Sequence, residues 1–368
     1  MLRMATAADK AELKALWLLC FPEETQEFLD WFFDNRFLPE YCPVLMEAGR
    51  VAACLHALPA HIRLRGSALP CAIVAGVATH PDFRGRGLMR QVLGFFLERM
   101  RAEGVPLLPH RPVRLEVYRS AGHFPVSDSG YLQLPAGAPR PARDACVELC
   151  LPAHYAALYR CYARFAQGYS GIIDRSYPDF VFKCQDYLSC GAKAIAALDG
   201  EGGVAGYCVY YDEPSGLVGE ECAALSRGAY GRLWEGLARR SAGRPLTLRL
   251  APDAGLRPAG AQARAEPRGV LGVADVTALF RVTGLSGGAI QVEDPLVAAN
   301  RGVFDLTGRP SNEQPQLRIP AGRLAQWAVG YRTLESIVQA GEAEAADPAI
   351  VAKMDSIGTC PCFIIDEY

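Results

Sequence analysis

One stretch, Ile73–Arg90, constrains what this chain can fold into more than any other. Its first half is an apolar run with the length of a buried strand. His80-Pro81-Asp82 ends that strand, because proline cannot donate to a β-ladder and aspartate favours a turn. A Gly-rich turn, RGRG, then leads into apolar residues at helical spacing. Because the first N–H groups of a helix lack intrahelical partners, this order of elements predicts an anion-binding site.

The turn differs from two common phosphate-binding loops, since it has neither Gly-Lys-Ser/Thr nor G-x-G-x-x-G. It resembles the pyrophosphate loop of the GNAT acetyltransferases, which is Arg/Gln-x-x-Gly-x-Gly/Ala after a valine-rich strand. Arg84 and Gly87 fit that loop, and Met89 stands where a small residue is usual. The departure, R-x-R-G-L-hydrophobic-R, is similar to the enhanced intracellular survival (Eis) branch of the superfamily. The alternative is a Gly-rich surface turn that binds nothing.

Composition limits the other function classes. The 368 residues are 50% hydrophobic, which suits two or three domains, each with a core. A net charge of -2 without any basic block argues against nucleic acid as the main partner. No apolar run is long enough for a signal peptide or a membrane span, so we expect a cytoplasmic protein without a membrane partner. The 13 scattered cysteines predict buried thiols, with neither a disulfide framework nor a metal site.

A weak internal repeat follows a Pro/Ala/Gly linker at Pro135–Arg143. Gly203–Cys208 echoes Gly49–Cys54, and Val218–Leu233 can be laid over Val74–Arg90. The second copy lacks Arg-x-x-Gly at its turn, so we infer a second GNAT-like domain that no longer binds the cofactor. A chance match of two apolar strand–helix pairs is the alternative.

A second loop-rich stretch, Ala251–Gly269, marks another boundary. Beyond it, the pattern predicts strands near 289–292, 302–306 and 316–319, and helices near 322–329 and from 333 onward. The resemblance to Eis-type proteins implies an α+β fold in three parts. These are a catalytic GNAT domain over residues 1–140, a degenerate GNAT-like domain over 141–269 and a sterol carrier protein-like domain over 270–368.

The resemblance also implies which residues hold acetyl-CoA, the expected cosubstrate. The backbone N–H of Val77 is the implied oxyanion donor, and Arg84 and Arg86 are equally consistent with surface cations, since one arginine suffices to reach phosphate. The full set expected to bind the pantetheine and pyrophosphate is Val77, Ala78, Thr79, Arg84, Gly85, Arg86, Gly87, Leu88 and Met89.

Tyr118 is the candidate general acid. The segment Tyr118–His123 matches the family's Tyr-x-x-x-Gly-aromatic pattern, in which the tyrosine protonates the departing sulfur. A phenol of pKa about 10 can protonate a thiolate whose conjugate acid has a pKa of about 8.5 if it is held in place. The alternative is a core tyrosine with its hydroxyl bonded to backbone. His123 stands where Phe or Tyr is usual, and is either a core histidine or part of the cofactor tunnel.

The first domain offers no clear general base. In Eis-type enzymes the C-terminal carboxylate of the chain takes this role, which implies Tyr368 here. The apolar run Phe363-Ile364-Ile365 would anchor such a tail. The alternative is a frayed terminus.

An acidic and aromatic stretch is the candidate acceptor site. Asp30 and Trp31, together with Glu367, suit a polycationic amine, because carboxylates attract ammonium groups and aromatic faces hold them. The same residues are equally consistent with a solvated helix that has a buried aromatic face.

These observations predict an acetyl-CoA-dependent N-acetyltransferase of the Eis type whose acceptor is an aminoglycoside-like compound or a polyamine. The resemblance implies a homo-oligomer, notably a hexamer. Two alternatives stay open. One is the same enzyme acting on protein lysine or a small-metabolite amine, and the other is a non-catalytic protein that binds acyl-CoA or lipid.

Overall fold

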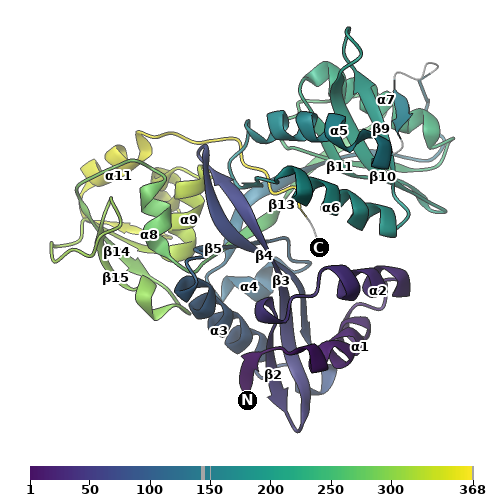
Figure 1. Ribbon diagram of the computed structural model, residues 1–368. Coiled ribbons are helices and arrows are strands. Elements are labelled where there is room, and N and C mark those ends of the chain that lie inside the picture. Colours follow the sequence, from purple (N-terminus) through teal and green to yellow (C-terminus); the bar gives the residue numbers. More distant parts are fainter. Residues whose placement is uncertain (142–145, 150, 367–368) are drawn as a thin grey trace. The chain divides into compact units, whose positions relative to one another are not determined.

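The computed structural model of this protein describes residues 1–141, 146–149 and 151–366. The chain divides into two compact units. Unit 1 contains Met1–Ser127, Tyr169–Ile173 and the chain from Arg268 onward, and unit 2 contains Asp128–Gly168 and Asp174–Pro267. The beginning and the end of the chain thus share one unit, as the purple and yellow segments in Figure 1 show. The boundaries expected near residues 140 and 269 stay a prediction.

A mixed sheet forms the frame of unit 1, with its strands in the order β1-β2-β3-β4-β5-β13 and β8 paired to β3. Neighbours from β1 to β4 are antiparallel, whereas β4 and β5 are parallel. The strands are β1 (Leu2–Met4), β2 (Pro43–Glu47), β3 (Arg50–Leu64), β4 (Ser67–Thr79), β5 (Leu107–His110), β8 (Ile172–Ile173) and β13 (Gln262–Val273), of which the last four residues pair with β5.

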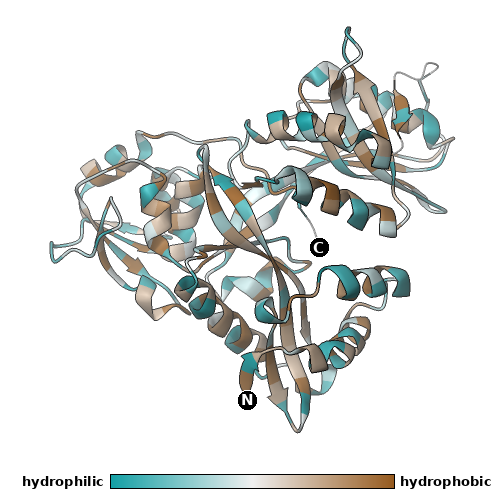
Figure 2. Ribbon diagram, viewed as in Figure 1, coloured by the Kyte–Doolittle hydropathy of each residue, from teal (hydrophilic) through white to brown (hydrophobic). Residues whose placement is uncertain are grey.

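Helices cover both faces of this sheet. Helices α1 (Lys10–Cys20) and α2 (Gln26–Asn35) share a core with Cys54 of β3, and α3 (Leu88–Ala102) shares another core with the next residue, Leu55. Successive strand residues point to opposite faces, so one strand supplies both cores. Figure 2 shows the strands mostly hydrophobic and the helices mixed. The helix predicted after the Gly-rich turn is confirmed.

The C-terminal part of unit 1 has its own small sheet, in the order β15-β14-β16-β17. The strands and helices predicted from its sequence are confirmed within a few residues. Its core continues into the main sheet, because Trp327 and Ile364 share one apolar cluster with Ile62 of β3. The elements are α8 (Val276–Arg281), β14 (Ala289–Glu293), β15 (Gly302–Asp305), β16 (Leu317–Pro320), α9 (Ala321–Val329), α10 (Leu334–Gln339), β17 (Glu344–Ala345) and α11 (Pro348–Asp355).

Unit 2 has a sheet in the order β6-β12-β11-β10-β9-β7, and its described residues also form the helices α5, α6 and α7. Its β10–β11–α7 segment repeats the β3–β4–α3 order of unit 1, as the internal repeat predicted. The helix start differs, because the Ser226 side chain accepts a hydrogen bond from the Ala229 N–H. The elements are β6 (Phe124–Leu134), β7 (Val147–Leu149), α5 (Leu151–Ala166), α6 (Tyr177–Ser189), β9 (Lys193–Leu198), β10 (Val204–Glu213), β11 (Gly216–Ala224), α7 (Arg227–Arg240) and β12 (Leu246–Leu250).

A buried ion pair lies inside unit 2. The Arg175 guanidinium donates to both carboxylate oxygens of Glu221, at 3.0 and 2.7 Å, and both side chains are almost fully buried. The hydroxyls of Tyr187 and Tyr207 donate to the same carboxylate, at 3.0 and 2.6 Å. Four charge-assisted hydrogen bonds therefore replace the water that this carboxylate loses on folding.

Among the helices of the described residues, none combines the length and the apolar character that crossing a membrane requires.

Candidate active site

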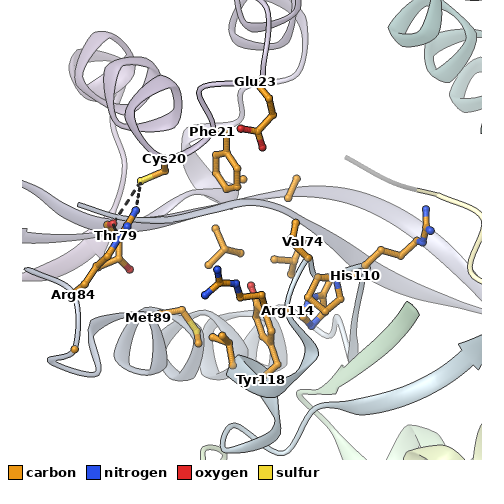
Figure 3. A pocket seen from close by; sticks show the side chains of 18 residues that line it. Cys20, Phe21, Glu23, Val74, Thr79, Arg84, Met89, His110, Arg114 and Tyr118 are labelled. Atoms are coloured by element: carbon orange, nitrogen blue, oxygen red, sulfur yellow. Dashed lines mark hydrogen bonds between the residues drawn. The ribbon is translucent and has the colours of Figure 1, made fainter. Parts of the chain in front are cut away.

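The sheet of unit 1 opens between β4 and β5. These parallel strands pair at Cys71 and Leu107, and β4 then runs on to Thr79 while β5 ends at His110. A cavity of about 750 Å³ lies where the strands part. Its lining comes from β4 between Val74 and Thr79, from the segments that follow α1 and β5, and from the turn before α3 (Figure 3).

A bulge in β4 lies on this cavity. The register with β3 passes from Cys54 opposite Ala78 to His56 opposite Ala75, so Gly76 and Val77 together stand opposite Leu55. Such a bulge twists a strand and re-aims its backbone groups. Gly76 has φ +50°, in the left-handed region that glycine adopts most readily. Both bulge residues line the cavity, so backbone groups outside the regular ladder are available there.

The turn between β4 and α3 has the form predicted for an anion site. A short 3-10 helix, η3 (Pro81–Phe83), follows the strand, and Gly85 and Gly87 have φ of +77° and +71°. Gly87 is the N-cap of α3 and provides no side-chain hydrogen bond to the first turn. A Cβ on either glycine would point into open space. The first-turn N–H groups therefore stay available to an anion, which the helix dipole also favours.

The two arginines of this turn lie differently. The Arg84 Nε donates to the Thr79 carbonyl at 3.1 Å, and Arg84 lines the cavity (Figure 3). Arg86 instead forms an ion pair with Glu47 at 3.2 Å and stacks over the Phe83 ring. Arg84 is thus the turn's cation at the cavity, and Arg86 braces the turn from outside.

Of the residues expected to hold acetyl-CoA, those on the cavity wall are Val77, Thr79, Arg84, Gly85 and Met89. Ala78 and Leu88 are buried in the two cores on either side of the sheet, and Gly87 begins α3. Along the end of the strand, Val77 and Thr79 on the wall alternate with Ala78 in the core, as the alternation of side chains in a strand requires.

Tyr118 lies on α4 (Leu115–Arg119) and lines the same cavity. The residue is 8% exposed, and burial raises its pKa to about 12. Among the described residues its hydroxyl has no hydrogen-bond partner, so the expected alternative of a backbone-bonded core tyrosine does not apply to them. The phenol therefore keeps its proton near neutral pH and is available as a proton donor in the cavity.

Comparison with known protein families decides the nature of this part of the chain. Residues 1–126 match the acetyltransferase (GNAT) domain family. These residues form a GNAT acetyltransferase domain. Residues 286–361 match the sterol carrier protein domain family, which agrees with the expected C-terminal part. No curated protein matches the chain.

Solved structures share the fold over the whole chain. A probable N-acyltransferase from Enterococcus faecalis superposes with a TM-score of 0.82 at 16% identity, covering 100% of this chain and 99% of its own. A GCN5-related N-acetyltransferase from Anabaena variabilis gives 0.80 at 18% identity, with 100% of each chain covered. Eis1 from Mycobacterium abscessus gives 0.73 at 17% identity, again with 100% of each chain covered.

These matches confirm the predicted fold class, which is an α+β chain with a GNAT domain and a sterol carrier protein-like domain. They also confirm the prediction of an enzyme of the N-acetyltransferase class. GNAT enzymes use an acyl-CoA donor. The uncapped helix start, the two open glycines and Arg84 fit the pyrophosphate of such a donor.

The expected acceptor residues of the GNAT domain lie off this cavity. Asp30 pairs with Lys14, and neither Asp30 nor Trp31 belongs to the cavity wall. Phe21 and Glu23, between α1 and α2, lie on the wall instead (Figure 3). Helix α2 buries the opposite face, including Phe28, Leu29, Phe32 and Phe33. The acidic residues near its surface thus match the alternative of a solvated helix face.

The predicted base, Tyr368, and Glu367 lie outside the described residues. The tail before them is anchored, because Phe363, Ile364 and Ile365 are each 1% exposed. The Ile364 N–H donates to the Ser127 hydroxyl at 3.2 Å. Burial is the main cause that raises the pKa of the Cys71 thiol, and the charge of Asp366 raises this pKa further. Cys71 is the residue of β4 that pairs with β5. The tail is therefore held in the core of unit 1 up to Asp366.

Five charged or titratable residues of the wall were not predicted as site residues from the sequence: Cys20, Glu23, His110, Arg111 and Arg114. His110 ends a buried strand, where an apolar residue is usual, and this position is the only signal that the sequence offered. Figure 3 shows Arg114 directed into the cavity beside Tyr118. In the described part of the chain, no group of three or more His, Cys, Asp or Glu side chains is placed to hold a metal ion.

Proposed function

We propose that this chain is an acetyl-CoA-dependent N-acetyltransferase that transfers an acetyl group to an amine. One observation carries the proposal: a single cavity at the β4–β5 split is lined both by the glycine turn before α3 and by Tyr118. The turn suits the pyrophosphate of the donor. The thioester would then lie along β4, near the bulge at Gly76 and Val77 and within reach of Tyr118.

Each part of the wall has a role in this reaction. The Val77 N–H stabilises the charge that develops on the thioester oxygen. As the amine nitrogen bonds to the acetyl carbon and the carbon–sulfur bond breaks, Tyr118 passes its phenolic proton to the sulfur. Burial raises the pKa of Tyr118 to about 12, so the phenol is protonated at neutral pH and can donate to the sulfur as the carbon–sulfur bond breaks. The C-terminal carboxylate of Tyr368 takes the proton that the amine loses.

The base assignment is supported by the tail, whose residues from Phe363 to Asp366 are buried in unit 1. The Eis-type assignment is supported by the same feature, by the two family matches in their expected order, and by the full-length likeness to Eis1. The Eis-type assignment also implies a homo-oligomer, notably a hexamer. Light scattering after size-exclusion chromatography tests this, and a monomer at assay concentration contradicts it.

Two acceptor classes fit different residues of the wall. The Glu23 carboxylate favours a polycationic amine such as an aminoglycoside or a polyamine. Arg111 and Arg114 lie on the same wall and repel a second or third ammonium group, which favours a small amine that carries an anionic group. Protein lysine is the remaining candidate from the sequence.

An amine panel with acetyl-CoA tests the proposal. Release of CoA is followed with polyamines, aminoglycosides, amino acids and a lysine peptide, beside calorimetric titration of acetyl-CoA alone. Turnover with any member supports the enzyme, and the preferred member identifies the acceptor class. Acetyl-CoA binding with no turnover over the whole panel would instead indicate an acyl-CoA sensor. If acetyl-CoA does not bind, the proposal that this cavity holds the acyl donor is wrong.

A further inference from the structure

Two histidines lie behind the cavity wall in contact with each other. Nε2 of His110 and Nδ1 of His123 are 2.9 Å apart, which is a hydrogen bond whose donor depends on the tautomers of the two rings. The residues are 3% and 2% exposed. The acetyl transfer described above uses neither of them. In the part of the chain that the structure describes, the only side-chain hydrogen bond of either ring is the one to the other ring, and such a buried polar pair requires a physical explanation.

The pair is built into the surroundings of Tyr118. The ring centroids of His110 and Tyr118 are 4.6 Å apart, and the His123 backbone N–H donates to the Tyr118 carbonyl at 3.1 Å. The His123 ring lies against Gly272 of β13, where a Cβ would be 2.4 Å from its Cε1 atom. Any larger residue at position 272 would displace the ring. Three elements therefore fix His123 in place.

The two outer nitrogens of the pair differ in their surroundings. His110 lines the cavity, and its Nδ1 has no partner among the described residues. Nε2 of His123 is buried and also lacks a described partner. Burial keeps both rings neutral, since it lowers the pKa of His123 to about 4 and, with the nearby His123, holds the pKa of His110 well below its usual value. Each ring therefore carries one proton.

The buried Nε2 atom of His123 determines which nitrogen of each ring carries the proton. In proteins a buried N–H without an acceptor is rarer than a buried acceptor that lacks a donor. The isolated Nε2 of His123 is therefore the unprotonated nitrogen, and His123 carries its proton on Nδ1. That proton is donated to Nε2 of His110, so His110 carries its own proton on Nδ1. The tautomer of the cavity residue is thus set by the ring behind it.

We propose that His123 is a positioning residue that holds His110 in the Nδ1–H tautomer, so that His110 presents a neutral hydrogen-bond donor to the cavity beside Tyr118. The proposal rests on the acetyl transfer proposed above. It assigns His110 to the stabilisation of an acceptor atom, such as the thioester oxygen or the sulfur, and not to removal of the amine proton. The titratable or charged groups that share its surroundings are Tyr118 of α4, Arg111, Arg114 and, on the same wall, Glu23. The facing residues of β4 and β13, Val74–Val77 and Val270–Val273, have none.

The first test reads the tautomers directly and needs no substrate. The full chain is labelled with ¹⁵N-histidine, and its six histidines are assigned by single substitution. We expect His110 and His123 as neutral Nδ1–H rings at pH 7. In His123→Phe, we expect His110 to exchange between both tautomers. An Nε2–H ring at His110 in the native protein, a charged His110, or an unchanged tautomer in His123→Phe would each overturn the proposal.

A second test separates positioning from packing. His123→Phe keeps an aromatic ring but no polar atom, whereas His123→Asn loses the ring but places an amide N–H near the position of Nδ1. A positioning role predicts that kcat falls about 10-fold or more in His123→Phe and less in His123→Asn, with the KM for acetyl-CoA unchanged in both. A packing role predicts the reverse order, which would refute the proposal. If the native protein acetylates nothing, the tautomer measurement still decides between these roles, so the two failures stay distinct.

Discussion

The indole ring of Trp17 stands where a side chain on Gly76 would have to stand, because its Cζ3 atom is 2.4 Å from the position of a Cβ on that glycine. Trp17 belongs to α1 and its side chain lies in the core between this helix and the sheet, whereas Gly76 is in the bulge that lines the cavity. The packing of the helix layer and the shape of the bulge are therefore set by one contact.

Gly76→Ala should lower the free energy of unfolding by about 2 to 4 kcal/mol, since it adds both overpacking and a strained φ. Gly49→Ala is the matched control: Gly49 has φ +79° with nothing near its Cβ position, so it adds strain alone and should cost about 1 to 2 kcal/mol. Urea unfolding of both variants measures the difference. Equal losses would show that the Trp17 contact has no energetic role.

Tyr118→Phe should lower kcat by about 100-fold or more while the affinity for acetyl-CoA stays the same, because only the phenolic proton is removed. The ring stays in place against His110. Steady-state kinetics with the preferred amine measures kcat, and titration measures the affinity. Native turnover in this variant would remove Tyr118 from the mechanism.

Gly87→Val should weaken acetyl-CoA binding at least 10-fold, since the new side chain would strain the helix start and obstruct the N–H groups that face the pyrophosphate. Gly104→Val is the control. Gly104 follows the other end of α3, has φ +75° and has equally open space around it. If both variants bind acetyl-CoA as tightly as the native protein, the turn is not the anion site.

A short extension after Tyr368 should abolish acetylation and leave acetyl-CoA affinity nearly unchanged, because it replaces the proposed carboxylate base by a neutral amide. The same extension placed before Met1 serves as the control. CoA release and calorimetry measure the two properties. Full activity of the C-terminally extended protein would contradict the base assignment.

Glu221→Gln should destabilise unit 2 at pH 7 by about 3 to 5 kcal/mol, because it leaves Arg175 buried with its charge uncompensated. Although burial opposes ionisation, the Arg175 charge and its hydrogen bonds, with those of Tyr207, hold the pKa of Glu221 below its usual value. A carboxyl group whose pKa is lowered on folding stabilises the folded state at pH values above its pKa in the unfolded chain. This stabilisation is lost as the pH falls through the pKa of the group in the folded state.

The difference between Glu221→Gln and the native protein should therefore shrink as thermal unfolding is followed from pH 7 into the acid range. The double variant Arg175→Met, Glu221→Leu removes both charges and should recover most of the stability. A pH-independent difference would show that the hydrogen bonds, and not the charge, hold this cluster together.

The sequence predicted the elements whose signal is local. Helix α3 and the strands of the C-terminal part followed from apolar periodicity and glycine positions, and the repeat in unit 2 followed from two matching strand–helix runs. The start of α7 differs from that of α3, since the Ser226 side chain already gives one N–H of the first turn a partner, which agrees with the inference that this repeat does not bind the cofactor. Such a cap is visible in sequence once the helix start is known.

The cavity wall could be predicted only in part. The strand and the turn bring their own residues together, whereas Glu23, His110 and Arg114 come from three other segments. These residues lie close together because β5 separates from β4 after Cys71. A local sequence pattern does not predict this separation. For the same reason, α2 was read for charge and aromatic content, but its sequence does not say which neighbour the aromatic face meets. That face packs on α1 and β3.

The anchored tail has a consequence for how the molecule is made. Ile364 packs in the same apolar cluster as Ile62 of β3 and bonds to Ser127, which lies 237 positions earlier in the chain. A ribosome therefore synthesises the GNAT strands long before the residues that complete their core exist. Contacts of such separation slow folding and leave apolar surface exposed in the meantime. A fragment cut to residues 1–126 should accordingly aggregate, and chaperone demand should peak late in translation.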